Sequence, residues 1–135
     1  AYADVLRSEL PHDDAGTPML DLVMLGMGPD GHTASLFPGT NPYTDDDTLV
    51  RAPYVHKFAT FRLTVTPRVL TSARNVAVAA GGQSKAAALA AVLSENVDDA
   101  TYPIAVLRRA AGHLTWFVDR DAAARLPLPS AATTT

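Results

Sequence analysis

Three short apolar runs constrain the fold of this chain more than any other feature. They are Met19–Leu25, Asn75–Ala80 and Leu114–Val118, and a glycine or an aspartate follows each of them. Continuous apolar runs of this length are typical of strands buried inside a parallel sheet. The first run is the most uniformly apolar, so we expect it to be a central strand covered on both faces.

Segments with helical character stand between and around these runs. Apolar residues recur at helical spacing over Tyr2–Leu10, and Pro67, preceded by a capping threonine, begins a second predicted helix. A third covers the alanine-rich segment Ser84–Leu93 with Ser84 as its N-cap, and Asp119 caps a closing helix that ends at Leu126. Strands alternating with helices predict an α/β fold with a parallel sheet and ligands at the carboxyl ends of its strands.

The remaining segments are harder to place. Arg62–Thr66 alternates with β-branched residues and predicts a further strand, whereas residues 37–53 hold three prolines and three consecutive aspartates and predict a surface loop. We expect Leu63, Trp116 and Phe117 to lie in the core. Residues 127–135 predict a disordered tail to a single domain that spans residues 1–135.

Composition excludes several classes of function. The 135 residues include no cysteine, which excludes thiolate chemistry. Their net charge of −3 argues against binding to nucleic acid. The absence of cysteine is compatible with a reducing compartment, so we expect a cytoplasmic protein. No apolar stretch approaches the roughly 18 residues of a membrane span, so we expect no membrane partner. The chain begins without methionine and as if inside a helix, from which we expect an upstream portion to be missing.

The loop after the first strand carries candidate chemistry. Residues 26–31 match the GxGxxG pattern of dinucleotide-binding proteins, but no long helix follows and Asp30 stands where a pyrophosphate would bind. What remains is His32 beside Asp30 at a strand end. An imidazole, with its ordinary pKa near 6.5, exchanges protons at neutral pH, and a carboxylate fixes its tautomer. From the residues alone, a general base and a plain turn are both open.

A second candidate is a phosphate site. Gly81 and Gly82 lie between a strand and a helix, where backbone N–H groups and the charge of Lys85 would bind a phosphate monoester. Arg62 could hold the same phosphate through its planar guanidinium group. Without the Walker A spacing, a nucleoside triphosphate is not indicated. The alternative of a simple turn with a surface lysine is equally open.

Residues 26–38, Gly-Met-Gly-Pro-Asp-Gly-His-Thr-Ala-Ser-Leu-Phe-Pro, resemble the signature of the 6-phosphogluconolactonase family. Further blocks match in order at residues 62–67, 78–86 and 116–119. The resemblance implies a Rossmann-like α/β sandwich shared with sugar-phosphate isomerases, without the family's N-terminal half. It also implies metal-free and cofactor-free hydrolysis of a sugar-phosphate lactone by a monomer or weak homodimer. In this interpretation His32 is the general base beside Asp30, and the substrate-binding residues are Gly28, Gly31, Arg62 and Lys85.

Two alternatives stay open. Related deaminases carry a glutamate five residues beyond the corresponding histidine, where this chain has Phe37, which favours hydrolysis over isomerase or deaminase chemistry. A regulatory domain that binds a sugar phosphate without turnover would share the same sheet.

Overall fold

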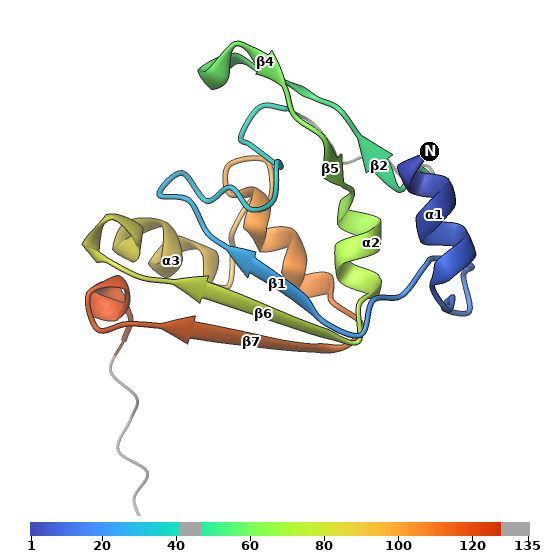
Figure 1. The fold of residues 1–135 in the computed structure, drawn as a ribbon. Coiled ribbons are helices and arrows are strands. Elements are labelled where there is room, and N and C mark those ends of the chain that lie inside the picture. The colour runs from blue at the N-terminus through green and yellow to red at the C-terminus, as the bar shows by residue number, and fades with distance from the viewer. Residues whose placement is uncertain (41–46, 128–135) are drawn as a thin grey trace, which may run out of the picture.

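A three-stranded parallel sheet forms the centre of the computed structural model, which describes residues 1–40 and 47–127. Its strands lie in the order β1 (Val23–Gly26), β6 (Asn75–Ala80) and β7 (His113–Val118) (Figure 1). Gly26 at the end of β1 pairs with Ala79 near the end of β6. The loops after these neighbouring strands therefore leave the same edge of the sheet. The predicted α/β class with a parallel sheet is confirmed.

Short helices accompany the sheet, and the first, second and third predicted helices are present. The described residues form α-helices and 3-10 helices (η) at α1 (Tyr2–Glu9), η1 (His56–Phe58), α2 (Pro67–Ser72), η2 (Gln83–Lys85), α3 (Ala86–Val92), η3 (Pro103–Arg109) and η4 (Ala122–Arg125). None of these helices is long and apolar enough to cross a membrane.

The core lies on one face of the sheet. Helices α2, α3 and η3 all lie above the strands in Figure 1. Val76 and Val78 of β6 point to this side and pack with fully buried leucine and isoleucine side chains from the three helices: Leu70, Leu89 and Ile104. Alternate residues of each strand therefore supply the sheet's contribution to the core.

The opposite face is open within the described residues, which corrects two predictions. Strand β1 is an edge strand rather than a doubly covered central one, and its Met24 side chain is 78% exposed. Phe117 of β7, expected in the core, is 61% exposed, whereas its neighbour Trp116 is half-buried on the covered side. An apolar run does not reveal which faces of a strand are covered, because the exposed positions and the buried positions of these strands both carry apolar residues.

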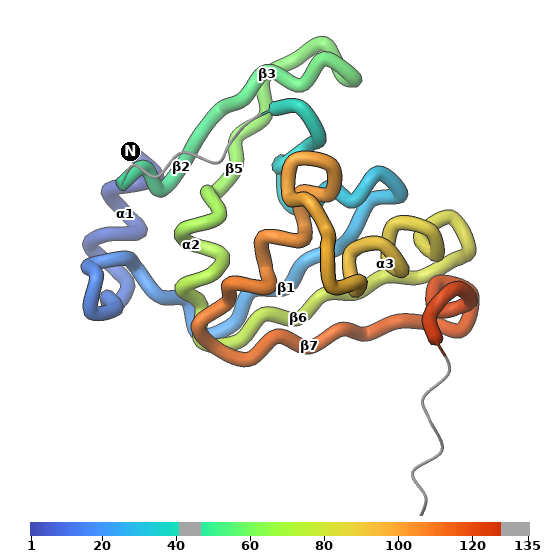
Figure 2. Tube along the Cα trace, turned by 180° about the vertical axis from the view of Figure 1, so that it is seen from behind, coloured from blue at the N-terminus to red at the C-terminus, as the bar shows by residue number. Residues whose placement is uncertain are grey.

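Two small antiparallel pairs lie apart from the main sheet. Strand β2 (Val50–Arg51) pairs with β5 (Thr64–Val65), and β3 (Tyr54–Val55) pairs with β4 (Thr60–Phe61). Figure 2 shows this extension above the helices. The strand predicted over residues 62–66 is thus reduced to β5.

Arg62 itself belongs to no strand. Leu63, expected in the core, is 65% exposed because residues 62–63 connect two short strand pairs instead of crossing the sheet. The predicted surface loop over 37–53 is also wrong in part, since Phe37 and Leu49 are buried. Its residues 41–46, like the predicted tail from residue 128 onwards, lie outside the described residues.

The helix caps agree with the sequence in part. Thr66 is the N-cap residue and Pro67 the first residue of α2, as predicted, but the hydroxyl of Thr66 donates to the carbonyl of Thr48 and makes no hydrogen bond to the helix. Ser84 is not an N-cap, because it lies inside η2 before α3 begins. Asp119 does accept a hydrogen bond from the backbone N–H of Ala122 at the start of the closing helix.

Candidate active site

The loop after β1 is closed by its own hydrogen bonds. The buried hydroxyl of Thr33 donates to the carbonyl of Gly26 over 2.8 Å, and the N–H of Gly28 donates to the carbonyl of His32 over 2.9 Å. Gly31 adopts φ of +78°, which side chains disfavour, and its N–H donates to the carbonyl of Gly28. The loop therefore returns on itself and presents His32 at the carboxyl end of β1.

His32 and Asp30 form a hydrogen-bonded dyad at this loop. The ring Nδ1 of His32 lies 2.6 Å from Oδ1 of Asp30, and the backbone N–H of His32 donates to the same oxygen over 3.1 Å. Burial raises the pKa of Asp30, but the hydrogen bonds from His32, the positive charge of the His32 ring when it is protonated and the ammonium charge of Lys57 outweigh it. The pKa of Asp30 is therefore held below its ordinary value, and a charged carboxylate orients the imidazole.

Gly28 makes room for this dyad. A Cβ atom at this position would lie 2.0 Å from Nδ1 of His32 and 2.7 Å from Oδ1 of Asp30. Any side chain here would displace the hydrogen bond between the two groups. At Gly31, the corresponding atom would lie 2.7 Å from the ring of Tyr102, so this glycine packs against η3 and its preceding residue.

Aromatic rings support the other side of the imidazole. The ring of Phe37 stacks on that of His32 with centroids 4.3 Å apart, and Phe58 contacts Phe37 edge-on at 5.4 Å. The guanidinium of Arg62 lies 5.0 Å from the centre of the Phe58 ring. Two aromatic rings, Phe58 and Phe37, thus lie in the series of contacts from Arg62 to His32.

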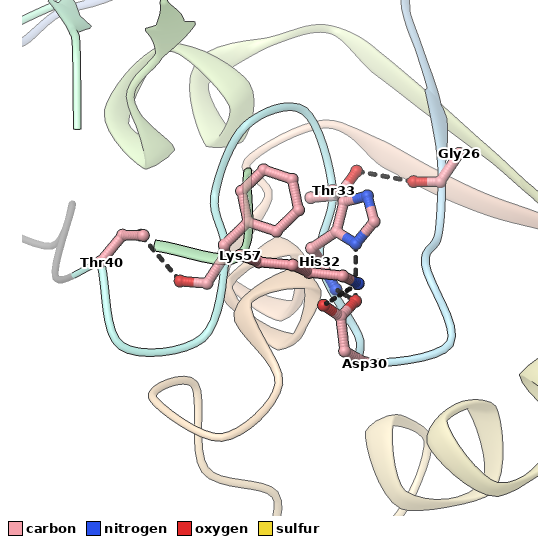
Figure 3. Close-up of polar contacts among 7 residues, drawn as sticks. Gly26, Asp30, His32, Thr33, Thr40 and Lys57 are labelled. Atoms are coloured by element: carbon pink, nitrogen blue, oxygen red, sulfur yellow. Dashed lines mark hydrogen bonds and ion pairs between the residues drawn. The ribbon is translucent and has the colours of Figure 1, made fainter. Parts of the chain in front are cut away.

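Lys57 reaches the dyad from a distant part of the chain. Its ammonium nitrogen lies 3.7 Å from Oδ2 of Asp30, the carboxylate oxygen that faces away from the imidazole contact (Figure 3). The residue belongs to η1 at the tip of the β3–β4 pair. Asp30 therefore lies between an imidazole and an ammonium group.

His32 and Lys85 line the same pocket. This pocket encloses about 440 Å³, and its walls include Gly28, Thr33 and Met24 of the β1 segment. Lys85 comes from η2, after the neighbouring strand β6. Of the six predicted site residues, the structure brings Gly28, His32 and Lys85 to the pocket wall, with Asp30 hydrogen-bonded to His32. Gly31 and Arg62 are not among its lining residues.

The predicted phosphate cradle is only partly present. The N–H of Gly82, expected to face a ligand, donates to both carboxylate oxygens of Asp119 at 2.9 and 3.1 Å. A negative charge therefore stands where an anion was expected, and α3 has only seven residues. The ammonium of Lys85 is the feature of this segment that suits a phosphate.

Sequence reasoning missed Lys57, which contacts Asp30, and Phe58, which contacts the Phe37 ring that stacks on His32. Neither is close in sequence to His32, and only the fold brings them there. The sequence showed that Phe37 replaces the glutamate of the deaminases, but it did not predict that the Phe37 ring stacks on the imidazole. Within residues 1–40 and 47–127, no three His, Asp or Glu side chains form a group that could hold a metal ion.

Comparison with known proteins gives a consistent assignment. Residues 1–116 match the family described as glucosamine-6-phosphate isomerases/6-phosphogluconolactonase. The chain is 40% identical over 130 residues to 6-phosphogluconolactonase of Bos taurus and 39% identical to that of Homo sapiens. Each alignment covers 95% of this chain but 49% of the relative. The chain thus spans about half the length of the curated relatives it matches.

Solved structures agree with the sequence relatives. The structure of 6-phosphogluconolactonase from Trypanosoma brucei superposes with a TM-score of 0.82 at 31% identity, over 93% of this chain and 51% of that one. A monomeric glucosamine-6-phosphate deaminase superposes with a TM-score of 0.63 at 21% identity, over 78% of this chain and 47% of that one, which shows the shared fold alone. The predicted resemblance is confirmed: the chain belongs to the family of glucosamine-6-phosphate isomerases and 6-phosphogluconolactonases.

Proposed function

We propose that the protein hydrolyses 6-phospho-D-glucono-1,5-lactone to 6-phosphogluconate. The observation that carries this proposal is a pocket lined by both a carboxylate-paired imidazole, His32, and an ammonium group, Lys85. An ester hydrolase for a phosphorylated sugar needs both groups: a base for water and a cation for the phosphate. The relatives named 6-phosphogluconolactonase support the same reaction.

The dyad determines how the base would act. Because Nδ1 of His32 is engaged by Asp30, the other ring nitrogen, Nε2, takes a proton from water. The resulting hydroxide adds to the lactone carbonyl and gives a tetrahedral intermediate with a negatively charged oxygen. When the bond between the carbonyl carbon and the ring oxygen breaks, Nε2 returns the proton to that oxygen. Asp30 stays charged and stabilises the imidazolium between these steps.

Binding of the phosphate orients the lactone. Lys85 holds the phosphate, so the carbonyl at the other end of the sugar lies at His32. We retain Arg62 as a second phosphate ligand on the family resemblance, although its guanidinium rests on Phe58.

Phe37 supports hydrolysis over deaminase or isomerase chemistry. By the family resemblance, Phe37 stands at the sequence position where the deaminases carry a glutamate, and its ring stacks on His32 with centroids 4.3 Å apart. A phenyl ring offers no group to move protons during ring opening. We further propose that the protein acts in the cytoplasm on this diffusible substrate, without nucleic acid, as a monomer or weak homodimer.

The test is the rate at which freshly prepared lactone is consumed. Loss of the general base predicts a fall in kcat of about a hundredfold or more for His32→Ala. His113→Ala is the matched control, because His113 is exposed at the amino end of β7 and should leave the rate unchanged. Equal rates for the wild type and His32→Ala would refute the proposed function.

A further inference from the structure

The sequence contains two lysines, and both lie at the candidate site. Lys85 lines the pocket, whereas Lys57 contacts Asp30 from the tip of the β3–β4 pair. The two oxygens of the Asp30 carboxylate have different partners: Oδ1 faces the imidazole of His32 at 2.6 Å and Oδ2 faces the ammonium of Lys57 at 3.7 Å. Figure 3 shows the lysine side chain extending to this carboxylate.

We propose that Lys57 is a positioning residue, which holds the Asp30 carboxylate so that Oδ1 stays aligned with Nδ1 of His32. The inference rests on the proposed function, in which this dyad is the general base. A carboxylate can rotate about its side-chain bonds, and the two hydrogen bonds from His32 both reach Oδ1 and leave Oδ2 without a hydrogen bond from His32. A cation at the second oxygen restricts this rotation and keeps both oxygens occupied.

The backbone at the tip gives Lys57 a defined place. The N–H of Ala59 donates to the carbonyl of His56 over 3.1 Å, with Ala59 in the left-handed conformation at φ of +49°. Next to Lys57, the ring of Phe58 contacts Phe37, which stacks on His32. The tip therefore contacts the Asp30 carboxylate directly through Lys57, and it contacts through Phe58 the Phe37 ring that stacks on the imidazole.

If Lys57 acts through its charge, its removal should change the titration of His32, whereas the loss of a packing contact should not. The charged groups around His32 are Asp30 on its own loop, Lys57 from η1 and Lys85 from η2, with Arg62 connected to it through the contacts of two aromatic rings. Lys57 offsets part of the negative charge of Asp30. Its removal makes the surroundings of the imidazole more negative, which favours the protonated ring.

The experiment compares Lys57→Gln with Lys57→Arg in the 135-residue chain. Proton NMR follows the ring signals of His32 through a pH titration, assigned with His32→Ala. We expect the titration midpoint to move to higher pH by about half a unit in Lys57→Gln and to return in Lys57→Arg, as a single nearby charge predicts. An unmoved midpoint in Lys57→Gln would overturn the proposal.

Kinetics with the lactone test positioning directly. We expect kcat of Lys57→Gln to fall about twofold to fivefold, the range for a solvent-exposed ion pair, with KM unchanged. A raised KM with unchanged kcat would assign Lys57 to substrate binding and overturn the proposal. Since Lys57 is 58% exposed, its variants should unfold at the wild-type temperature.

The two proposals fail separately. The NMR titration needs no turnover, so it reports on Lys57 even in a chain that consumes no lactone. If the wild type and His32→Ala consume lactone equally, the proposed function fails. The titration midpoint of His32 in Lys57→Gln still shows whether Lys57 acts on the dyad through Asp30.

Discussion

Asp30 has the most connections at the candidate site. Its carboxylate accepts from the ring and the backbone N–H of His32 and faces Lys57, so three positively polarised groups surround it. These contacts outweigh burial, which by itself would raise the pKa, and hold the pKa of Asp30 below its usual value of 3.8. The carboxylate is therefore charged throughout the pH range in which an imidazole ordinarily titrates.

The lowered pKa of Asp30 predicts how stability depends on pH. A carboxyl group with a lower pKa in the folded state stabilises the fold above its unfolded pKa, and this stabilisation is lost as the pH falls through the folded value. We therefore expect the difference in unfolding free energy between the wild type and Asp30→Asn to shrink between about pH 5 and about pH 3. Urea unfolding at both pH values measures it, and a difference that stays constant or grows would contradict the assigned contacts.

Single residues were predictable from the sequence where local chemistry identified them. His32 and Asp30 lie two positions apart in a glycine-rich turn after a strand, and Lys85 follows a second glycine turn. Lys57 carried no such sign, because its role depends on a hairpin that places it against Asp30. The Gly82 N–H was misjudged for the same reason, since its partner Asp119 comes from the end of β7.

At the scale of elements, the loop after β1 depends on the absence of a side chain at Gly28. The loop is held by the bonds from Thr33 to Gly26 and from Gly28 to His32, which bring the imidazole against position 28. Unlike Gly31, Gly28 does not need a positive φ, so its backbone would accept alanine. What alanine would disturb is the contact between His32 and Asp30.

Gly28→Ala should therefore impair catalysis by displacing the imidazole. We expect kcat to fall by about tenfold or more, as general-base alignment is lost. Gly26→Ala serves for comparison, because a Cβ atom there would meet nothing within 4 Å, and we expect a smaller loss. Steady-state kinetics on both variants measure this, and equal kcat values for the two would contradict the geometry of the loop.

The sequence predicted whether a segment forms a helix or a strand better than it predicted which of its side chains are buried. Runs of apolar residues identified β1, β6 and β7, and Pro67 marked the start of α2. Burial was less predictable, since Met24 and Phe117 lie on strands whose other side chains form the core. A strand can be apolar throughout whether one or both of its faces are covered. Its residue pattern alone therefore does not show which other elements pack against each face.

At the scale of the whole molecule, the parallel sheet explains why distant segments meet. Neighbouring strands lie about 5 Å apart, and β1 and β6 run in the same direction. The loops that follow them consequently leave side by side, which brings His32 and Lys85 to one pocket. The sequence predicted this convergence because alternating strands and helices imply parallel strands, and parallel strands end at a common edge.

Half of the length of the curated relatives has no counterpart in this chain, and the described residues leave one face of the sheet open. Met24 belongs both to that open face and to the wall of the pocket. The dyad and Lys85 nevertheless come entirely from residues of this chain. The candidate base and phosphate-binding lysine can therefore be tested here directly.

NMR titration with 6-phosphogluconate, the product of the proposed reaction, tests most directly whether His32 and Lys85 bind one ligand. Reductive ¹³C-methylation labels the two lysines while keeping their charge, and Lys57→Arg identifies the signal of Lys85. We predict that the His32 ring and Lys85 methyl signals shift together with a single Kd, while the His113 ring does not respond. A response of only one of the two groups, or of neither, would contradict a shared site.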